Sequence, residues 1–213
     1  MASVVSFSGS KGGTGKTTAA HLCAHGAGSL SRPIATVLIT TDPLDLLVAD
    51  ARRYLVVDGR NPQLLADALA RYADVERALV IVDGVANRPD IDGIVAQFAD
   101  LAVLPYGPSR QEADRVAAEL GKLKGAIALP NRWPKHPGTA SRVKRWLQAV
   151  PANRRLPPFP ALPKLDGLLD EAGYAGLAYE IASPSRGLAL EVLAALRVDP
   201  DDLAAPRKPE LAV

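Results

Sequence analysis

Short apolar runs alternate with amphipathic stretches along this chain of 213 residues. The runs are rich in valine, leucine, isoleucine and alanine, as is typical of parallel strands that are buried on both faces. They cover residues 3–7, 35–42, 78–83, 101–105 and 126–131, with a weaker candidate at 54–58. Helical patterns cover residues 16–27, 64–73, 139–149 and 185–197. The alternation predicts an α/β fold with a single doubly wound, mostly parallel sheet and helices on both faces.

A glycine-rich loop lies between the first strand and the first helix. Residues 9–18 read GSKGGTGKTT and include the G-K-[ST] ending of the phosphate-loop pattern G-x-x-x-x-G-K-[ST]. In such a loop the backbone N–H groups surround nucleotide phosphates, the lysine reaches the β- and γ-phosphates, and the hydroxyl holds Mg²⁺. The strand before the loop and the helix after it supply the required context, so we predict a nucleoside triphosphate site. Its residues are Gly12, Gly13, Thr14, Gly15, Lys16, Thr17 and Thr18.

The loop carries an extra lysine, Lys11, for which the ordinary pattern has no role. The segment Lys11–Thr17 resembles the K-G-G-x-G-K-[ST] loop of the ParA/MinD family of deviant Walker A ATPases. The resemblance implies ATP and Mg²⁺ as cofactors and a homodimer that encloses two nucleotides. It also implies that Lys11 acts in trans on the partner's ATP, which makes dimerisation depend on the nucleotide. Lys11 and Lys16 are therefore catalytic candidates.

Polar residues at the ends of later strands complete the predicted site. The carboxyl ends of parallel strands meet at one edge of a sheet, so these residues are expected to gather around the loop. By resemblance, Asp42 is catalytic and positions the attacking water, Asp83 is the Walker B carboxylate, and Asn131 contacts the adenine base. The Mg²⁺ ligands would be Thr17, Asp42 and Asp83. A proline-rich loop at 157–163 would lie near the base, also by resemblance.

Basic residues are concentrated in one part of the chain. The net charge is only +2, yet residues 110–155 carry eleven basic and three acidic residues. A helix over 139–149 would place Arg142 and Arg145 on its solvent side. Clustered cations on a helix suit contact with DNA phosphates without base readout, as the family makes, although a solvated basic face is the alternative. The predicted DNA-contacting residues are Arg132, Lys135, Arg142, Lys144 and Arg145.

Composition also argues against several classes of protein, namely membrane-spanning, disulfide-bonded and lipid-docking proteins. No apolar run approaches the roughly 18 residues of a membrane span, and the single cysteine, Cys23, cannot form an internal disulfide. Prolines and acidic residues in 199–213 oppose a MinD-like amphipathic helix that docks on lipid. We expect an ATPase domain at 1–198, a disordered tail at 199–213, no membrane partner, and a cytoplasmic, nucleoid-associated protein.

The residues and the resemblance together predict a ParA-like ATPase. It would dimerise around ATP, bind DNA non-specifically, and hydrolyse ATP when a centromere-binding or cargo adaptor stimulates it. The cycle would partition or position a plasmid, a chromosome region or a protein cargo. Three alternatives stay open: a MinD-like membrane-associated ATPase, a P-loop amide-forming synthetase, and a hydrolysis-deficient nucleotide-binding scaffold. The last rests on departures from the family's motifs at Thr40, Leu44 and Gly84.

Overall fold

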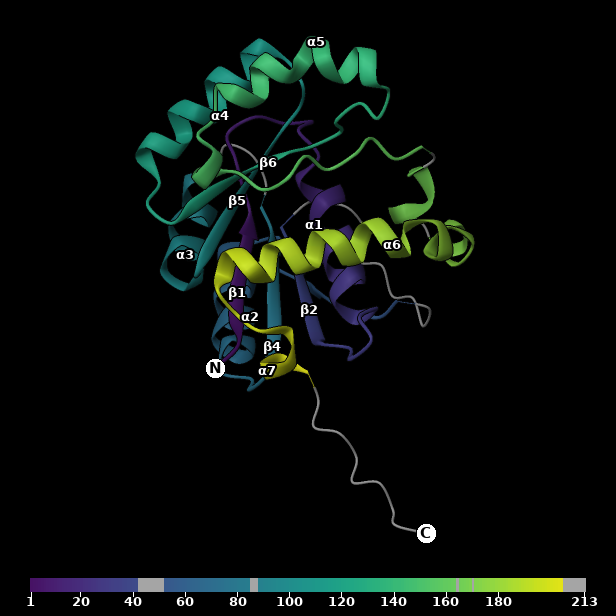
Figure 1. The fold of residues 1–213 in the computed structure, drawn as a ribbon. Coiled ribbons are helices and arrows are strands. Elements are labelled where there is room, and N and C mark those ends of the chain that lie inside the picture. The colour runs from purple at the N-terminus through teal and green to yellow at the C-terminus, as the bar shows by residue number, and fades with distance from the viewer. Residues whose placement is uncertain (42–51, 85–87, 164, 170, 205–213) are drawn as a thin grey trace.

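Six parallel strands form one sheet in the computed structural model, which describes residues 1–41, 52–84, 88–163, 165–169 and 171–204 (Figure 1). Their order is β3-β2-β4-β1-β5-β6, and each pair of neighbours is parallel. The predicted single parallel sheet is confirmed, and the weak candidate at 54–58 forms an edge strand. The strands are β1 (Ser3–Phe7), β2 (Ala35–Thr40), β3 (Leu55–Asp58), β4 (Ala78–Asp83), β5 (Leu101–Tyr106) and β6 (Ala126–Pro130).

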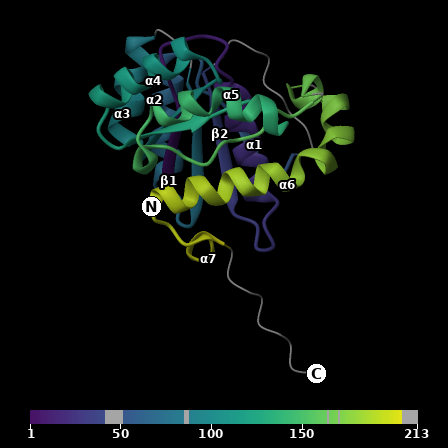
Figure 2. The same ribbon diagram turned by 45° about the horizontal axis from the view of Figure 1, so that its top comes forward.

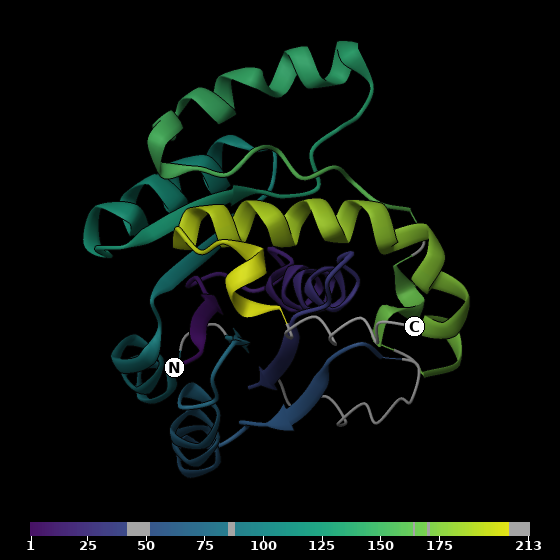
Figure 3. The same cartoon turned by 60° about the horizontal axis from the view of Figure 1, so that its bottom comes forward.

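Helices cover both faces of this sheet, as the doubly wound prediction requires. Helices α1 and α6 pack on one face, and α2, α3, α4 and α5 pack on the other (Figures 1 and 3). Among the described residues, none of the helices is both long and apolar enough to cross a membrane. The helices are α1 (Lys16–Gly28), α2 (Pro62–Ala73), α3 (Pro89–Phe98), α4 (Arg110–Lys122), α5 (Pro137–Gln148), α6 (Glu171–Leu196) and α7 (Pro200–Leu203), with 3₁₀ turns η1 (Ala152–Arg154) and η2 (Asp166–Leu169).

Alternate residues of each central strand build two separate cores. In β4, Leu79 and Ile81 face α1 and α6, whereas Val80 and Val82 face α2 and α3. All four side chains are fully buried. A strand between two helix layers needs apolar residues on both of its faces, which explains why these strands are continuous apolar runs in the sequence.

The longest helix, α6, lies directly against α1 (Figure 2). A side chain at Gly26 of α1 would collide with the backbone of Ser185 in α6, so the glycine permits the close approach. The helix begins at Glu171 and not at residue 185 as predicted, and it continues through Pro184. A proline ordinarily interrupts a helix. Here the buried side chains of Leu177 and Ile181, in the first half of α6, anchor it to the same core.

The end of the described chain packs against the domain. Leu203 of α7 and the following Ala204 are buried, and Ala204 forms a β-bridge with Ile34, just before β2. An ion pair of 2.8 Å joins Arg32 to Asp201. The folded domain therefore extends to residue 204, beyond the predicted boundary at 198. The rest of the predicted tail, 205–213, lies outside the described residues.

Candidate nucleotide-binding site

The glycine-rich loop leaves β1 at the carboxyl edge of the sheet. Strand β1 pairs with β4 on one side and β5 on the other, and ligands of α/β sheets bind where connections diverge in this way. Gly13 and Gly15 have φ angles of +74° and +89°, left-handed values that favour glycine. Gly15 is the residue that caps the start of α1. The loop therefore directs the positive end of α1 toward the space above the sheet.

Lys16 lies largely buried within the loop that precedes it. The residue is 7% exposed, and its Nζ donates a 2.9 Å hydrogen bond to the carbonyl of Lys11. Thr14 is 1% exposed. An ammonium held beside the N-terminus of a helix is a favourable place for an anion.

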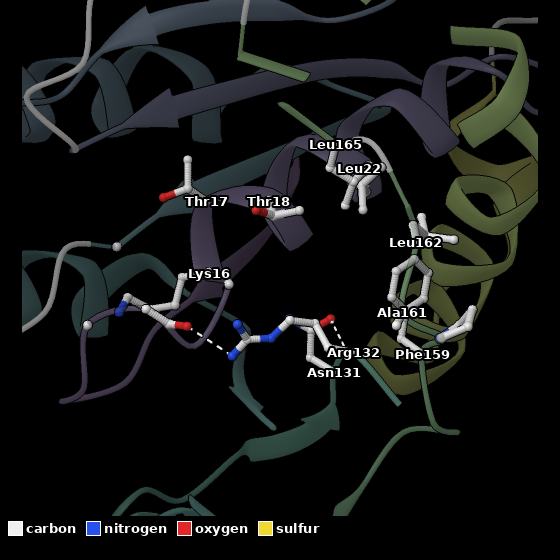
Figure 4. A pocket seen from close by; sticks show the side chains of 15 residues that line it. Lys16, Thr17, Thr18, Leu22, Asn131, Arg132, Phe159, Ala161, Leu162 and Leu165 are labelled. Carbon is white, nitrogen blue, oxygen red and sulfur yellow. Dashed lines mark hydrogen bonds between the residues drawn. The ribbon is translucent and has the colours of Figure 1, made fainter. Parts of the chain in front are cut away.

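The side chains of two residues that follow β6 donate hydrogen bonds to backbone carbonyls of the same loop. The Nδ2 of Asn131 donates to the carbonyl of Thr14 at 3.0 Å. The Nη2 of Arg132 donates to the carbonyl of Gly13 at 2.9 Å, and Figure 4 marks this bond with a dashed line. A side chain at Gly15 would collide with the Asn131 amide. In this structure Asn131 therefore supports the loop, and its predicted contact with adenine stays a prediction.

A cavity of about 540 Å³ opens beside the loop (Figure 4). One part of its wall is formed by the loop and the first turn of α1. Another, apolar part is formed by Leu22 of α1 together with Phe159, Pro160, Ala161, Leu162 and Leu165. Of the described residues that line it, Lys16 and Arg132 carry charge and none is a carboxylate. The volume and this division into a cationic and an apolar wall suit a small anionic ligand with an apolar ring.

Two candidate Mg²⁺ ligands lie at this edge of the sheet. Asp83 ends β4, is 1% exposed, and pairs in register with Phe7, the last residue of β1. Thr17 lines the cavity from α1. The described residues contain no cluster of three His, Cys, Asp or Glu side chains that fits a metal ion, but Mg²⁺ bound through phosphates needs only one or two protein oxygens. The third predicted ligand, Asp42, lies outside the described residues.

Lys11 pairs within its own subunit. Its Nζ lies 3.4 Å from Oε1 of Glu112, on the first turn of α4, with the lysine side chain 48% exposed. Glu112 also accepts a hydrogen bond from the backbone N–H of Gly107. Burial acts to raise the pKa of Glu112, but the Gly107 N–H and the charge of Lys11 outweigh it, so that the pKa lies below its usual value. The predicted action of Lys11 in trans stays a prediction.

A second contact between α4 and the loop was not recognised from the sequence. Glu119 accepts a hydrogen bond from the hydroxyl of Ser10 and a 2.7 Å ion pair from Arg115. Glu112, Arg115 and Glu119 follow the three- and four-residue spacing of one helix face. That spacing was the available signal, but charged pairs on helices ordinarily face solvent. Only the packing of α4 beside the loop shows that this helix face contacts Ser10 and Lys11 of the loop.

Four of the five residues predicted to contact DNA lie in α5 or just before it. All four are exposed, and helix α5 contains no buried residue. The helix begins at Pro137, two positions before the predicted Thr139. The Arg145 guanidinium lies 4.3 Å from the centre of the Trp146 ring. We call these four residues the α5 basic cluster: Lys135, Arg142, Lys144 and Arg145.

The other arginines of the basic segment have different partners. Arg132, the fifth predicted DNA contact, lies on the phosphate loop. Arg154 donates to backbone carbonyls of α4 and β6, including Ala126, and Arg155 donates to the carbonyl of Leu147. These guanidinium groups satisfy carbonyls inside their own subunit, so the segment offers fewer cations to a partner than its charge suggests.

Comparison with known proteins supports the fold. No protein-family model matches the sequence, and no curated protein matches it. The ATP complex of McdA from Cyanothece is 16% identical, with a TM-score of 0.59 over 93% of this chain and 97% of that one. The MinD protein of Pyrococcus horikoshii OT3, complexed with Mg-ADP, is 17% identical, with a TM-score of 0.61 over 90% and 96%.

A third solved structure, a ParA family ATPase from Chlorobium tepidum TLS, is 16% identical, with a TM-score of 0.63 over 90% of this chain and 98% of that one. The similarity therefore spans nearly the whole of each chain. At these identities it establishes the architecture. The chain has the fold of the ParA/MinD-type P-loop ATPases.

Proposed function

We propose that this protein is a ParA-like ATPase. In this proposal it binds ATP with Mg²⁺ in the cavity beside the glycine-rich loop and forms a homodimer around the nucleotides. The dimer binds DNA non-specifically and hydrolyses ATP when an adaptor protein stimulates it. The resulting cycle partitions or positions a plasmid, a chromosome region or a protein cargo.

The observation that carries this proposal is the cavity and its two unlike walls. The loop, with Lys16 buried at the N-terminus of α1, offers backbone N–H groups and a cation to phosphates. The apolar wall, which includes Leu22, Phe159 and Leu162, offers a surface to a purine ring. McdA and MinD, whose folds this chain shares, were solved with ATP and with Mg-ADP.

Each polar residue of the site has a separate role in the proposed reaction. Lys16 binds the β- and γ-phosphates, and Thr17 and Asp83 supply oxygen atoms for Mg²⁺. Bound Mg²⁺ would neutralise negative charge on the phosphates. Asp42 orients the water that attacks the γ-phosphate. Asn131 keeps the loop in shape through the carbonyl of Thr14.

Dimerisation and DNA binding use two other surfaces. Lys11 belongs to the glycine-rich loop, and its side chain is half exposed. Its ammonium can therefore reach the phosphates of a facing subunit. The α5 basic cluster is exposed on α5 and on the segment just before it, and its charges suit the phosphate backbone of DNA. ATP links the two surfaces because the nucleotide-bound dimer doubles the number of clusters that face one duplex.

Two variants measured beside the wild type test this proposal. Light scattering of the wild type should give a monomer mass without nucleotide and a dimer mass with ATP. Lys11→Ala should bind ATP as a monomer, and Lys16→Ala should bind ATP weakly or not at all. Unchanged ATP-dependent dimerisation of Lys11→Ala would contradict the role in trans.

The same preparations distinguish the alternative functions. Phosphate release stimulated by DNA and an adaptor supports the ATPase cycle. ATP binding without phosphate release under those conditions would support a hydrolysis-deficient scaffold. ATP-dependent binding to anionic liposomes would support a MinD-like ATPase. Turnover that requires a small carboxylic acid and ignores DNA would support a synthetase.

A further inference from the structure

Arg132 has a backbone conformation that its residue type rarely adopts. Its φ angle is +55°, in the left-handed region that favours glycine and asparagine. The described chain contains two other non-glycine residues of this kind. Arg197 directly follows the last residue of α6, where a left-handed residue is ordinary, and Arg77 lies in the turn before β4. Arg132 follows a strand and ends no helix, so its conformation needs another explanation.

The residues on both sides of Arg132 are buried and hydrogen-bonded. Asn131 is buried, with its side chain bonded to the carbonyl of Thr14 and to the backbone N–H of Arg132 itself. On the other side, Trp133 is buried, and its backbone N–H donates to the carbonyl of Phe159. With both neighbours turned into the protein, the left-handed turn presents the Arg132 side chain to the cavity (Figure 4).

The guanidinium of Arg132 retains capacity for a ligand. Its Nη2 donates to the carbonyl of Gly13, and within the described part of the chain Arg132 belongs to none of the ion pairs. The side chain is exposed, and it lines the same cavity as Lys16. A guanidinium has five N–H donors whose planar arrangement matches phosphate oxygens.

We propose that Arg132 is a second phosphate-binding cation of the nucleotide site. In the free protein the guanidinium donates one hydrogen bond to the Gly13 carbonyl. When a nucleotide binds, the remaining N–H groups of the guanidinium donate hydrogen bonds to its phosphate oxygens. Lys16 approaches the phosphates from within the loop, whereas Arg132 approaches from the end of β6. The inference rests on the proposed nucleotide site and names a further residue of it.

Two substitutions at this position separate the guanidinium from the backbone. Arg132→Gly removes the side chain and suits the left-handed conformation, so the variant should fold. Arg132→Lys keeps a cation without the planar donor arrangement. Arg77→Gly is the matched control, since it makes the same change at the same φ angle of +55° in a turn away from the cavity lining. Thermal unfolding of all four proteins checks that each is folded.

Calorimetric titration with ATP, ADP and adenosine provides the measurement. Arg132→Gly should weaken ATP and ADP binding about tenfold or more, because hydrogen bonds to charged groups contribute on that order. Adenosine affinity should not change. Arg132→Lys should fall between Arg132→Gly and the wild type, and Arg77→Gly should match the wild type.

Several results would overturn this inference. Equal ATP affinity of Arg132→Gly and the wild type would remove Arg132 from the site. An equal loss for adenosine would mean that Arg132 shapes the loop without contacting phosphate. Weaker binding of Arg132→Gly to a labelled DNA duplex, at unchanged ATP affinity, would make Arg132 a DNA contact, as the sequence alone predicted. Failure of the wild type itself to bind ATP would refute the proposed function instead.

Discussion

The ammonium of Lys11 lies 3.4 Å from Oε1 of Glu112. Under the proposed function, Lys11 cannot hold this carboxylate and reach the phosphates of a facing subunit at the same time. The ion pair therefore competes with dimerisation. Because the Lys11 side chain is 48% exposed, solvent screens this pair, and it contributes about as much as a surface ion pair, roughly 0.2–1 kcal/mol. The competition is therefore mild, and a nucleotide can overcome it.

Glu112→Gln should make dimerisation easier. Glutamine can still accept the hydrogen bond from Gly107 but no longer attracts Lys11. The ATP concentration for half-maximal dimerisation should fall by up to about fivefold, measured by light scattering across an ATP titration. Asp114→Asn is the control, because Asp114 is an exposed acid of the same helix that pairs with Arg110. A Glu112→Gln protein that needs more ATP than the control would refute the competition.

Gly15→Ala should damage both stability and nucleotide binding. The φ angle of +89° disfavours a side chain, and the new Cβ would collide with the Asn131 amide. We expect the free energy of unfolding in urea to fall by about 1–3 kcal/mol. When Asn131 is also replaced by alanine, Gly15→Ala should lower the free energy of unfolding by less. The collision with the Asn131 amide is then absent, and only the backbone strain remains.

A glycine with open space is the control for that experiment. Gly121, in α4, has no atom within 4 Å of an added Cβ. Gly121→Ala should raise the unfolding free energy by about 0.4–1 kcal/mol. If Gly15→Ala were as stable as Gly121→Ala, the contact between the loop and Asn131 would not constrain position 15.

Removal of Arg142 and Arg145 should weaken DNA binding and its salt dependence. Each phosphate contact contributes about one to the slope of log affinity against log salt, so the double alanine variant should lose roughly two. Fluorescence anisotropy of a labelled duplex, with ATP present, measures the slope. Arg71→Ala, an exposed arginine of α2, should leave it unchanged. An unchanged slope in the double variant would count against the α5 basic cluster.

His21 should make the protein less stable in mild acid. Burial, and secondly the charge of Arg52, lower its pKa from 6.5 to about 3, and its Nδ1 lies 2.8 Å from the hydroxyl of Tyr54. In the unfolded chain His21 therefore becomes protonated below pH 6.5, whereas in the folded protein it stays neutral down to about pH 3. Its contribution is complete above pH 6.5 and is lost as the pH falls toward 3.

Urea unfolding at pH 7 and at pH 5 checks this dependence. The loss from His21 should approach about 2 kcal/mol over the interval, at 1.36 kcal/mol per pH unit. His21→Asn should flatten the dependence, whereas His136→Asn, at an exposed histidine before α5, should retain it. Equal slopes in the two variants would show that His21 titrates normally.

The strands could be predicted closely and the longest helix could not. Strands β1 and β4 occupy the predicted residues 3–7 and 78–83, because burial on both faces demands an unbroken apolar run. The first half of α6 was missed. Its sequence contains Pro184, a helix-breaking signal that local pattern alone cannot outweigh, and the packing against α1 that keeps it helical comes from a distant part of the chain.

The amino-acid sequence by itself determined the phosphate loop and the parallel sheet around it. The loop is contiguous, so residues such as Gly15, Lys16 and Thr17 carry their geometry in local spacing. Only the tertiary structure decided that Lys11 pairs with Glu112 and that Arg132 belongs to the nucleotide cavity. Those partners come from segments more than a hundred residues apart. The direction of a charged side chain depends on which segments the folded sheet brings together, and no local pattern records that.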